Sequence, residues 1–258
     1  MTFPVYLDTS LDRAQCGDLL TLAGEEGHHA AAVRRSRPGE TIDVVNGRGL
    51  RARCEVRAVG KHMLDLAVRE ISQESADFPH ITLVQALAKG GRDEQAVESS
   101  TEYGVATVVP WESERCIASW RGKEEKGRAR WEATARAAAK QSRRSWLPIV
   151  EDAVSTKALV NKVRAVREAG GLVFVCHEEA STILADVLRG SFDAPSQVWI
   201  VVGPEGGITP SEVTALDAAG AQTVLLAPHV LRSASAGPYA IAVIAALCGS
   251  SSTSVPID

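Results

Sequence analysis

The chain has 258 residues, more than the commonest domain size, so we expect one large domain or two smaller ones. Hydrophobic content of 45% and charged content of 23% are typical of a soluble globular protein, and no apolar run approaches the ~20 residues that cross a bilayer. The net charge is −4. The five cysteines lack metal-ligand spacing and the N-terminus has no signal-peptide layout, so we expect a cytoplasmic protein without a metal site.

The first part of the chain predicts a small β-barrel. Its expected strands are Thr41–Val45, Ala52–Val59 and Met63–Val68. The dipeptide Asn46-Gly47 between the first two strands is a hairpin signal, and a short helix is expected around His28–Arg35. The polar stretch Ser72–Asp77 is typical of a linker. Residues 1–72 are therefore the first predicted domain.

From His80 onward, strands and helices alternate, which predicts an α/β domain with a parallel sheet covered by helices. The expected strands are Ile81–Leu87, Val105–Val109, Leu147–Val150, Leu172–Cys176, Val198–Val202 and Thr223–Ala227. The expected helices are Glu94–Tyr103, Lys126–Ser142, Lys157–Glu168, one that begins after Thr209, and Ala236–Cys248. Residues 78–250 are the second predicted domain.

Two loops near the C-terminus predict a ligand site. The first, Gly203–Gly207, follows a buried strand and precedes a helix start with Thr209 at the N-cap, Pro210 at the first position and Glu212 as capping-box partner. The second loop lies in the string Leu225–Arg232, which contains the end of the next expected strand and the residues that follow it. Because open α/β sheets bind ligands at the carboxyl ends of their strands, both loops are expected to face one ligand.

The glycine-rich turn lacks the features of the common nucleotide sites. It has neither a Gly-Lys-Ser/Thr ending nor the G-x-G-x-x-G arrangement, and residues 203–207 contain no Lys or Arg to hold a polyphosphate. Its backbone N–H and C=O groups would suit an adenine and a ribose. The alternative is an ordinary β–α turn whose glycines only supply positive φ angles.

Positive charge is concentrated in two segments of this acidic chain. Residues 34–57 contain seven arginines against three acidic residues, and residues 115–144 contain ten basic residues against three acidic ones. Anionic partners respond to local potential, so these segments predict nucleic-acid binding. Arg136, Lys140 and Arg144 repeat at i, i+4 and i+8, which predicts a phosphate-binding stripe on one helix face; an ordinary solvated face is the alternative.

Several short motifs occur in one order along nearly the whole chain. They are His29 with Val33 and Arg35, Pro38-Gly39-Glu40, Lys89-Gly90-x-Arg92, Thr101–Val105, Ser113–Cys116, Gln141-Ser142-x-Arg144, Gly203–Gly207 and Leu231–Ala236. In this order they resemble the ribosomal RNA small subunit methyltransferase E family of the SPOUT class. One departure is Ala234, which replaces the Glu of that family's L-R-T-E-T-A motif.

The resemblance implies a C-terminal SPOUT α/β domain with a deep trefoil knot that forms the cofactor pocket, and an N-terminal PUA-like β-barrel that grips RNA. It implies a homodimer with the knot region at the interface, no membrane partner, and S-adenosyl-L-methionine as cofactor. The implied reaction is methylation of uridine N3 in 16S rRNA of the small ribosomal subunit. Two alternatives stay open: methylation of another RNA, such as a tRNA ribose 2′-hydroxyl, and RNA binding without catalysis, because Ala234 removes a carboxylate.

The two loops, the basic segments and the resemblance together give the candidate site residues. The expected cofactor contacts are Val202, Gly203, Pro204, Glu205, Gly206, Gly207, Leu226, Ala227, Pro228, Val230, Leu231 and Ser233. The expected RNA contacts are Arg34, Arg35, Arg37, Lys89, Arg92, Arg115, Arg136, Lys140 and Arg144. Arg232 could stabilise the charge that spreads onto the uracil oxygens, or could be a structural tie. Glu205 could be a general base, or could cap backbone N–H groups.

Overall fold

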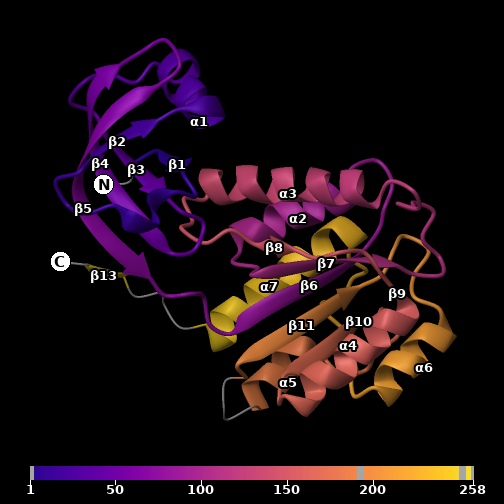
Figure 1. Ribbon diagram of the computed structural model, residues 1–258. Coiled ribbons are helices and arrows are strands. Elements are labelled where there is room, and N and C mark those ends of the chain that lie inside the picture. Colours follow the sequence, from indigo (N-terminus) through magenta and orange to yellow (C-terminus); the bar gives the residue numbers. More distant parts are fainter. Residues whose placement is uncertain (1–2, 191–194, 250–253, 257–258) are drawn as a thin grey trace. The chain divides into compact units, whose positions relative to one another are not determined.

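The computed structural model describes residues 3–190, 195–249 and 254–256, and the chain divides into two compact units (Figure 1). Unit 1 comprises Met1–Ala76, Ala139–Leu147 and Ser252–Asp258, and unit 2 comprises Asp77–Ala138 and Pro148–Ser251. Segment 139–147 therefore groups with unit 1, although it follows part of unit 2 in the chain.

Unit 1 is built on a six-stranded sheet that curls into a half-barrel. Its strands, in pairing order, are β1 (Val5–Leu7), β3 (Thr41–Val45), β4 (Leu50–Val59), β5 (Leu64–Glu74) and β13 (Ser254–Pro256), with β2 (Leu19–Leu22) also paired to β5. Only the β1–β3 pair is parallel among these described strands. Two register shifts between β4 and β5 favour the bend, because a bulge bends its strand. The predicted PUA-like barrel is thus confirmed in the form of a curled open sheet.

The core of unit 1 lies on one face of this sheet. Along β4 the side chains alternate between buried and partly exposed, and the buried ones are Leu50, Ala52, Cys54 and Val56. Three short helical segments accompany the sheet: η1 (Leu11–Arg13), α1 (Gly24–His28) and η2 (His29–Val33). The helix expected around His28–Arg35 is therefore present, but it begins earlier and ends at Val33.

The Asn46-Gly47 hairpin signal is confirmed between β3 and β4. The Asn46 side-chain oxygen accepts hydrogen bonds from the backbone N–H groups of Arg48 and Leu50 at 2.7 and 3.0 Å, and Gly47 has a φ of 78°. The linker expected from Ser72 is wrong at its start. Residues 72–74 continue β5, because they pair with both β4 and β13 and Ser72 is buried.

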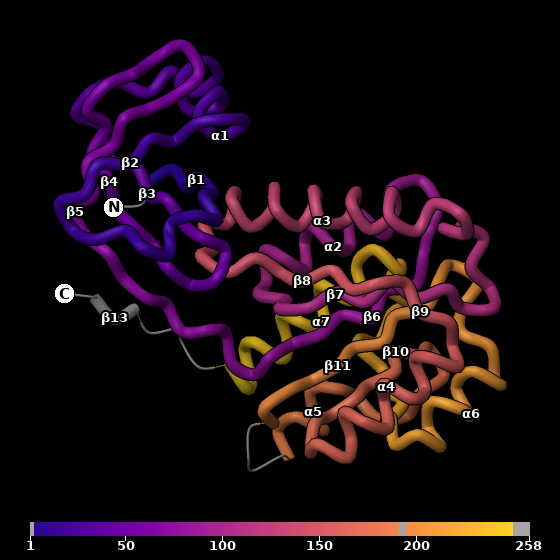
Figure 2. Tube along the Cα trace, viewed as in Figure 1, coloured from indigo at the N-terminus to yellow at the C-terminus, as the bar shows by residue number. Residues whose placement is uncertain are grey.

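Unit 2 contains a seven-stranded parallel sheet. Its strands are β6 (His80–Ala86), β7 (Thr107–Glu112), β8 (Ile149–Val150), β9 (Val154–Ser155), β10 (Leu172–Cys176), β11 (Gln197–Val202) and β12 (Gln222–Val224). The order is β12-β10-β11-β6-β7-β8, with β9 also paired to β7, so β6 lies beside β11 despite their separation in the chain (Figure 2). The predicted parallel sheet is confirmed.

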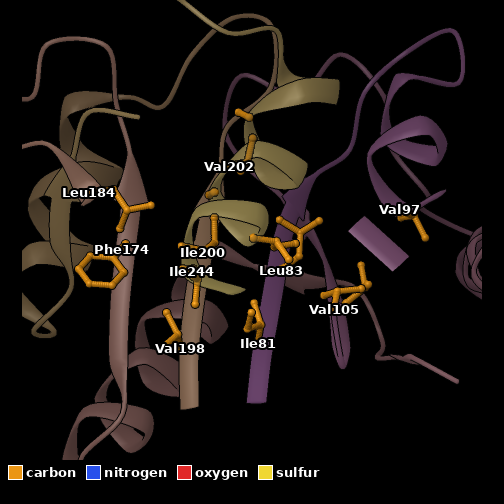
Figure 3. Close-up of a cluster of buried hydrophobic side chains, with 14 of the residues drawn as sticks. Ile81, Leu83, Val97, Val105, Phe174, Leu184, Val198, Ile200, Val202 and Ile244 are labelled. Carbon is orange, nitrogen blue, oxygen red and sulfur yellow. The ribbon is translucent and has the colours of Figure 1, made fainter. Parts of the chain in front are cut away.

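Helices cover both faces of this sheet and enclose two apolar cores. They are α2 (Arg92–Glu102), α3 (Glu124–Gln141), α4 (Thr156–Glu168), α5 (Leu184–Gly190), α6 (Pro210–Ala218) and α7 (Ser233–Cys248). Residues of α2, α5 and α7 pack on the face of Leu83 and Ile200 (Figure 3), and residues of α3 belong to the same core. Val84 follows Leu83 in β6, and Val201 follows Ile200 in β11, so their side chains point to the other face of the sheet. There they pack with residues of α4 and α6.

Several elements of unit 2 differ from the sequence expectations: β8 begins at Ile149 and α7 at Ser233, and further differences are larger. Helix α5 and strand β9 were not predicted, since both are short. Strand β12 ends at Val224 and not at Ala227, because Leu225 turns away to exchange backbone hydrogen bonds with Thr182 and Leu184.

No helix in the described ranges is long and apolar enough to span a membrane.

Gly127 in α3 makes room for a tryptophan pair. Trp120 and Trp131 meet edge to face at 5.1 Å between ring centroids, and a Cβ on Gly127 would lie 2.2 Å from the Trp120 ring. We expect Gly127→Ala to lower the free energy of unfolding by about 1–3 kcal/mol through overpacking, as denaturant unfolding would measure. In a Trp120→Leu background the same change should be neutral or stabilising, and an equal loss there would contradict the packing argument.

Candidate active site

A cavity of about 790 Å³ lies at the carboxyl ends of three neighbouring strands of unit 2. Its walls are the loops that follow β10, β11 and β12, together with the first turn of α7. This edge of an open parallel sheet is where such folds bind ligands, and the volume is that of a small-molecule site. Because β10 lies between β11 and β12, a third loop separates the two that the sequence predicted.

The cavity brings together all the residues for which a cofactor contact was predicted. The lining includes Val202, Gly203, Pro204, Glu205, Gly206, Gly207, Leu226, Ala227, Pro228, Val230, Leu231 and Ser233. The candidate catalytic residues Arg232 and Glu205 line it as well, as do Arg92 and Arg115 from the predicted RNA set. The structure thus places these residues at one site, while the contact of each with a ligand stays a prediction.

The loop after β10 is the wall that sequence reasoning missed. Cys176, His177, Glu178 and Glu179 line the cavity there. Burial raises the pKa of the Cys176 thiol to about 12, so this thiol stays protonated near neutral pH and is a poor nucleophile. Two adjacent carboxylates directly after a buried strand were the signal that could have marked this loop.

The glycines of the turn are required for different reasons. Only Gly207 has a positive φ, at 74°. A Cβ on Gly203 would lie 2.5 Å from Cγ1 of Ile208, and one on Gly206 would lie 3.2 Å from Cβ and 3.4 Å from the carbonyl oxygen of Arg115. The idea that these glycines only supply positive φ is therefore wrong for Gly203 and Gly206. A Cβ on Gly203 would clash with Ile208, and one on Gly206 would fit only if Arg115 moved by a few tenths of an ångström.

The predicted helix start at Thr209 is confirmed in full. The Thr209 side chain accepts from the backbone N–H of Glu212, the Glu212 side chain accepts from the backbone N–H of Thr209, and Pro210 begins α6. Glu212, which is 1% exposed, also accepts hydrogen bonds from the backbone N–H of Glu114 at 2.9 Å and from the Thr156 hydroxyl at 2.8 Å. The cap therefore also holds the loop that carries Arg115, a link that no local sequence pattern shows.

Ser233 joins two walls of the cavity. Its hydroxyl donates to the carbonyl oxygen of Gly203 at 2.9 Å and accepts from Nε2 of Gln85 at 2.9 Å. Gln85 is fully buried on β6, and its Nε2 also donates to the carbonyl oxygen of Ala86. The Ser233 proton is thus engaged by the protein, so Ser233 positions α7 against the glycine-rich turn in addition to lining the cavity.

Two of the arginines at the cavity are held by the glycine-rich turn. Arg92 Nη1 forms an ion pair with Glu205 Oε1 at 2.9 Å, and Arg115 Nη1 donates to the carbonyl oxygen of Gly206 at 3.0 Å. The Glu205 carboxylate is therefore an ion-pair partner, which makes it a weaker candidate for a general base than the sequence suggested. The alternative that Glu205 caps backbone N–H groups finds no such hydrogen bond among the described residues.

Arg232 differs from these two arginines. It occupies the N-cap position of α7, where its carbonyl oxygen accepts from the N–H groups of Ser235 and Ala236. Its side chain is exposed, lines the cavity and has no hydrogen bond or ion pair with any residue in the described part of the chain. The guanidinium group is therefore available to a ligand.

Comparison with known proteins identifies the family. A model of the RNA methyltransferase domain matches residues 75–245, and one of the RNA methyltransferase PUA domain matches residues 22–68. The chain is 41% identical to ribosomal RNA small subunit methyltransferase E of Mycobacterium tuberculosis, over 94% of this chain and 90% of that protein. This chain belongs to the ribosomal RNA small subunit methyltransferase E family.

Another member of this family and two solved methyltransferase structures are also similar to this chain. The Bacillus subtilis protein is 29% identical, with 93% of this chain and 94% of that protein covered. The crystal structure of a Neisseria gonorrhoeae methyltransferase E bound to S-adenosyl methionine has a TM-score of 0.85 at 26% identity, over 96% of this chain and 99% of that one. A putative methyltransferase of Legionella pneumophila in complex with the same cofactor has a TM-score of 0.82 at 26% identity, over 97% and 100%.

Ala234, the departure from the family motif, is buried in the first turn of α7 and is absent from the cavity lining. A carboxylate at this position would be buried, which is unfavourable without a partner. His229, by contrast, is exposed and lines the cavity.

Within the described ranges no group of three His, Cys, Asp or Glu side chains is placed to hold a metal ion.

The basic patch in unit 1 divides into two kinds of arginine. Four arginines, on β4 or in the turn before it, form ion pairs with carboxylates: Arg48 with Asp12, Arg51 with Asp43 and Glu74, Arg53 with Asp43 and Glu70, and Arg57 with Glu55. Arg34, Arg35 and Arg37, which follow η2, are exposed and form no ion pair or side-chain hydrogen bond within the described residues. Three of the seven arginines of this segment thus remain available to an anionic partner.

The predicted stripe of Arg136, Lys140 and Arg144 is wrong as a single helix face. Helix α3 ends at Gln141, so Arg144 lies beyond it. The Lys140 ammonium forms an ion pair with Glu26 at 2.6 Å, with both side chains mostly buried, so it is already neutralised. Arg136 is exposed on α3, and Lys89 is exposed before α2.

Proposed function

We propose that this protein transfers a methyl group from S-adenosyl-L-methionine to N3 of a uridine in 16S rRNA of the small ribosomal subunit. The observation that carries the proposal is that both predicted loops and three arginines line the same cavity, in a chain of this methyltransferase family. The proposal places the protein in the cytoplasm, where the ribosomal substrate is. The trefoil knot of the SPOUT class and the predicted domains, 1–72 for RNA binding and 78–250 for catalysis, belong to the same proposal.

The cavity fits the cofactor through its backbone. The residues of the glycine-rich turn, Gly203–Gly207, line the cavity, and their backbone N–H and C=O groups are proposed to hold the cofactor. Apolar groups of Leu226, Val230 and Leu231 line the second wall. When bound, S-adenosyl-L-methionine supplies the methyl group, and the residues of this chain hold and orient it.

The chemistry requires stabilisation of negative charge on the uracil. N3 attacks well only after it loses its proton, and the resulting charge spreads onto the ring oxygens. The free guanidinium of Arg232 is the group best suited to stabilise that charge, because it lines the cavity without a partner among the described residues. Arg92 and Arg115 hold the glycine-rich turn in place, and the cavity walls orient the base beside the methyl donor.

Methyl transfer to alternative RNAs tests the proposal. Purified protein with labelled S-adenosyl-L-methionine should methylate unmodified small ribosomal subunits and leave total tRNA unlabelled. Labelled tRNA would support the alternative of a ribose methyltransferase. Calorimetry that detects no cofactor binding would support an RNA-binding protein without catalysis.

The arginines after η2 are proposed to contact RNA phosphates. We expect replacement of Arg34, Arg35 and Arg37 by Gln to weaken binding to small subunits and to lower the salt-dependence slope by about 0.9 for each phosphate that is no longer bound. Cofactor affinity should not change. The matched control is the triple Gln variant of Arg53, Arg57 and Arg69, which are paired with carboxylates. Equal slopes for both triple variants in filter-binding titrations would contradict a special role of the η2 arginines.

We further propose that the protein is a homodimer through the outer face of α7. Tyr239 and Leu247 are 43% and 42% exposed there, and Val243 lies between them at helical spacing. Such an apolar stripe is unfavourable in water and typical of an interface. Light scattering should show a dimer for the wild type and a monomer for Tyr239→Asp with Leu247→Asp. The control, Ala133→Asp with Ala137→Asp on the exposed face of α3, should stay dimeric; a monomeric wild type would refute the proposal.

A further inference from the structure

Two arginines adopt a backbone conformation that favours glycine. Arg35 has a φ of 58° and Arg143 a φ of 61°, and no other residue than glycine has a positive φ within the described ranges 3–190, 195–249 and 254–256. The left-handed region is unfavourable for residues with a Cβ, which approaches the following carbonyl oxygen. Asn and Asp tolerate it better than Arg does.

The end of α3 imposes this conformation on Arg143. The N–H of Arg144 donates to the carbonyl oxygen of Ala139 at 2.9 Å, and the N–H of Arg143 donates to that of Lys140 at 3.1 Å. This pair of hydrogen bonds is the helix ending that normally has glycine at the position of Arg143.

The turn at Arg143 is also held in place from within unit 1. Its carbonyl oxygen accepts from Nη2 of Arg51 at 2.9 Å. Arg51 is 13% exposed and forms ion pairs with Asp43 and Glu74, and Glu74 accepts from the Ser145 hydroxyl at 2.5 Å. Because these groups fix the turn, Arg143 cannot relax to another conformation without breaking a buried ionic network.

Backbone contacts hold the turn at Arg143, but no side-chain contact among the described residues explains why arginine, and not glycine, stands at either position. The side chains of Arg143 and Arg35 are exposed and form no hydrogen bond or ion pair with any residue that the structure describes. The sheet arginines of the same unit, such as Arg53 and Arg57, pair with carboxylates. Residues that their surroundings hold in such unfavourable conformations cluster at functional sites.

We propose that Arg143 is a further RNA phosphate contact beside Arg35, and that both arginines are retained at positions where glycine would give a more stable fold. A guanidinium group binds a phosphate through two parallel hydrogen bonds, and a rigid turn presents it with little loss of entropy. Arg143 was not among the residues that the sequence singled out. This proposal rests on the proposed rRNA substrate, which Arg143 and Arg35 would bind.

The test is a substitution that separates stability from RNA binding. Arg143→Gly should raise the midpoint of thermal unfolding by about 2–4 °C, because it removes the strain. The same variant should bind unmodified small ribosomal subunits several-fold more weakly, with the salt-dependence slope lowered by about 0.9. Arg35→Gly should behave in the same way and is an independent repeat.

Two controls isolate the charge from the strain. Arg143→Lys keeps the charge and the strained backbone, so it should bind subunits nearly as well as wild type with no gain in stability. Arg164→Gln removes one exposed charge from α4 and should leave the salt slope unchanged. An Arg143→Gly variant that binds as tightly as wild type would overturn the proposal, as would one that is less stable. A wild type that fails to bind subunits would instead refute the proposed function.

Discussion

Arg232→Ala is expected to slow methyl transfer by about a hundredfold or more, which is the usual effect of removing a donor that stabilises an oxyanion. Arg232 lines the cavity at the N-cap of α7, with a side chain that no described residue binds. Its interaction is needed mainly in the transition state, so binding of cofactor and RNA should change little. Single-turnover methyl transfer at saturating RNA and cofactor measures this rate constant.

The control for Arg232 is lysine, which keeps the charge and loses the planar fork, so Arg232→Lys should restore the rate only in part. The melting temperature should stay near that of wild type in both variants, because the side chain makes no hydrogen bond or ion pair that the structure describes. If the rate constant is normal and only the melting temperature falls, Arg232 is a structural tie. Another residue would then have to stabilise the charge.

Gly206→Val is expected to weaken cofactor binding by about tenfold or more, which corresponds to an overpacking penalty of about 1.4 kcal/mol. The added Cβ would already lie 3.2 Å from Cβ of Arg115, and the two methyl groups of valine would reach further toward the same segment. Either the turn or the Arg115 loop must then move, and both line the cavity. Titration calorimetry with S-adenosyl-L-methionine gives the affinity.

The matched control for Gly206→Val is Ala58→Val, which introduces the same side chain at an exposed position of β4 in unit 1. It should leave cofactor affinity unchanged. Gly206→Ala should have an intermediate effect, because its Cβ is tight against Arg115 without the branched methyl groups. Unchanged affinity in Gly206→Val, with a folded protein, would show that the glycine-rich turn does not hold the cofactor.

Features encoded by local sequence could be predicted to the residue. The start of α6 depends on Thr209, Pro210 and Glu212 acting on their own neighbours, and the β3–β4 hairpin depends on Asn46 and its own turn. The walls of the cavity after β11 and β12 could be predicted for the same reason, since a buried strand followed by a glycine-rich or proline-containing turn is visible in the sequence.

Features that depend on pairing between distant segments could not be predicted. Nothing local shows that β10 lies between β11 and β12, and therefore the acidic loop after β10 was missed. The hydrogen bonds from Glu114 and Thr156 to Glu212 likewise join segments far apart in the chain. The ion pair between Lys140 and Glu26 also joins segments far apart in the chain. The helical spacing of the charges therefore predicted a basic stripe that the fold does not contain.

The most direct test of the central claim is nucleoside analysis of 16S rRNA by mass spectrometry, in cells with and without this protein. We expect one 3-methyluridine that is present in wild-type 16S rRNA, absent when the protein is absent, and restored by the wild-type chain but not by Arg232→Ala. A 16S rRNA that keeps the same methylated uridine without the protein would contradict it.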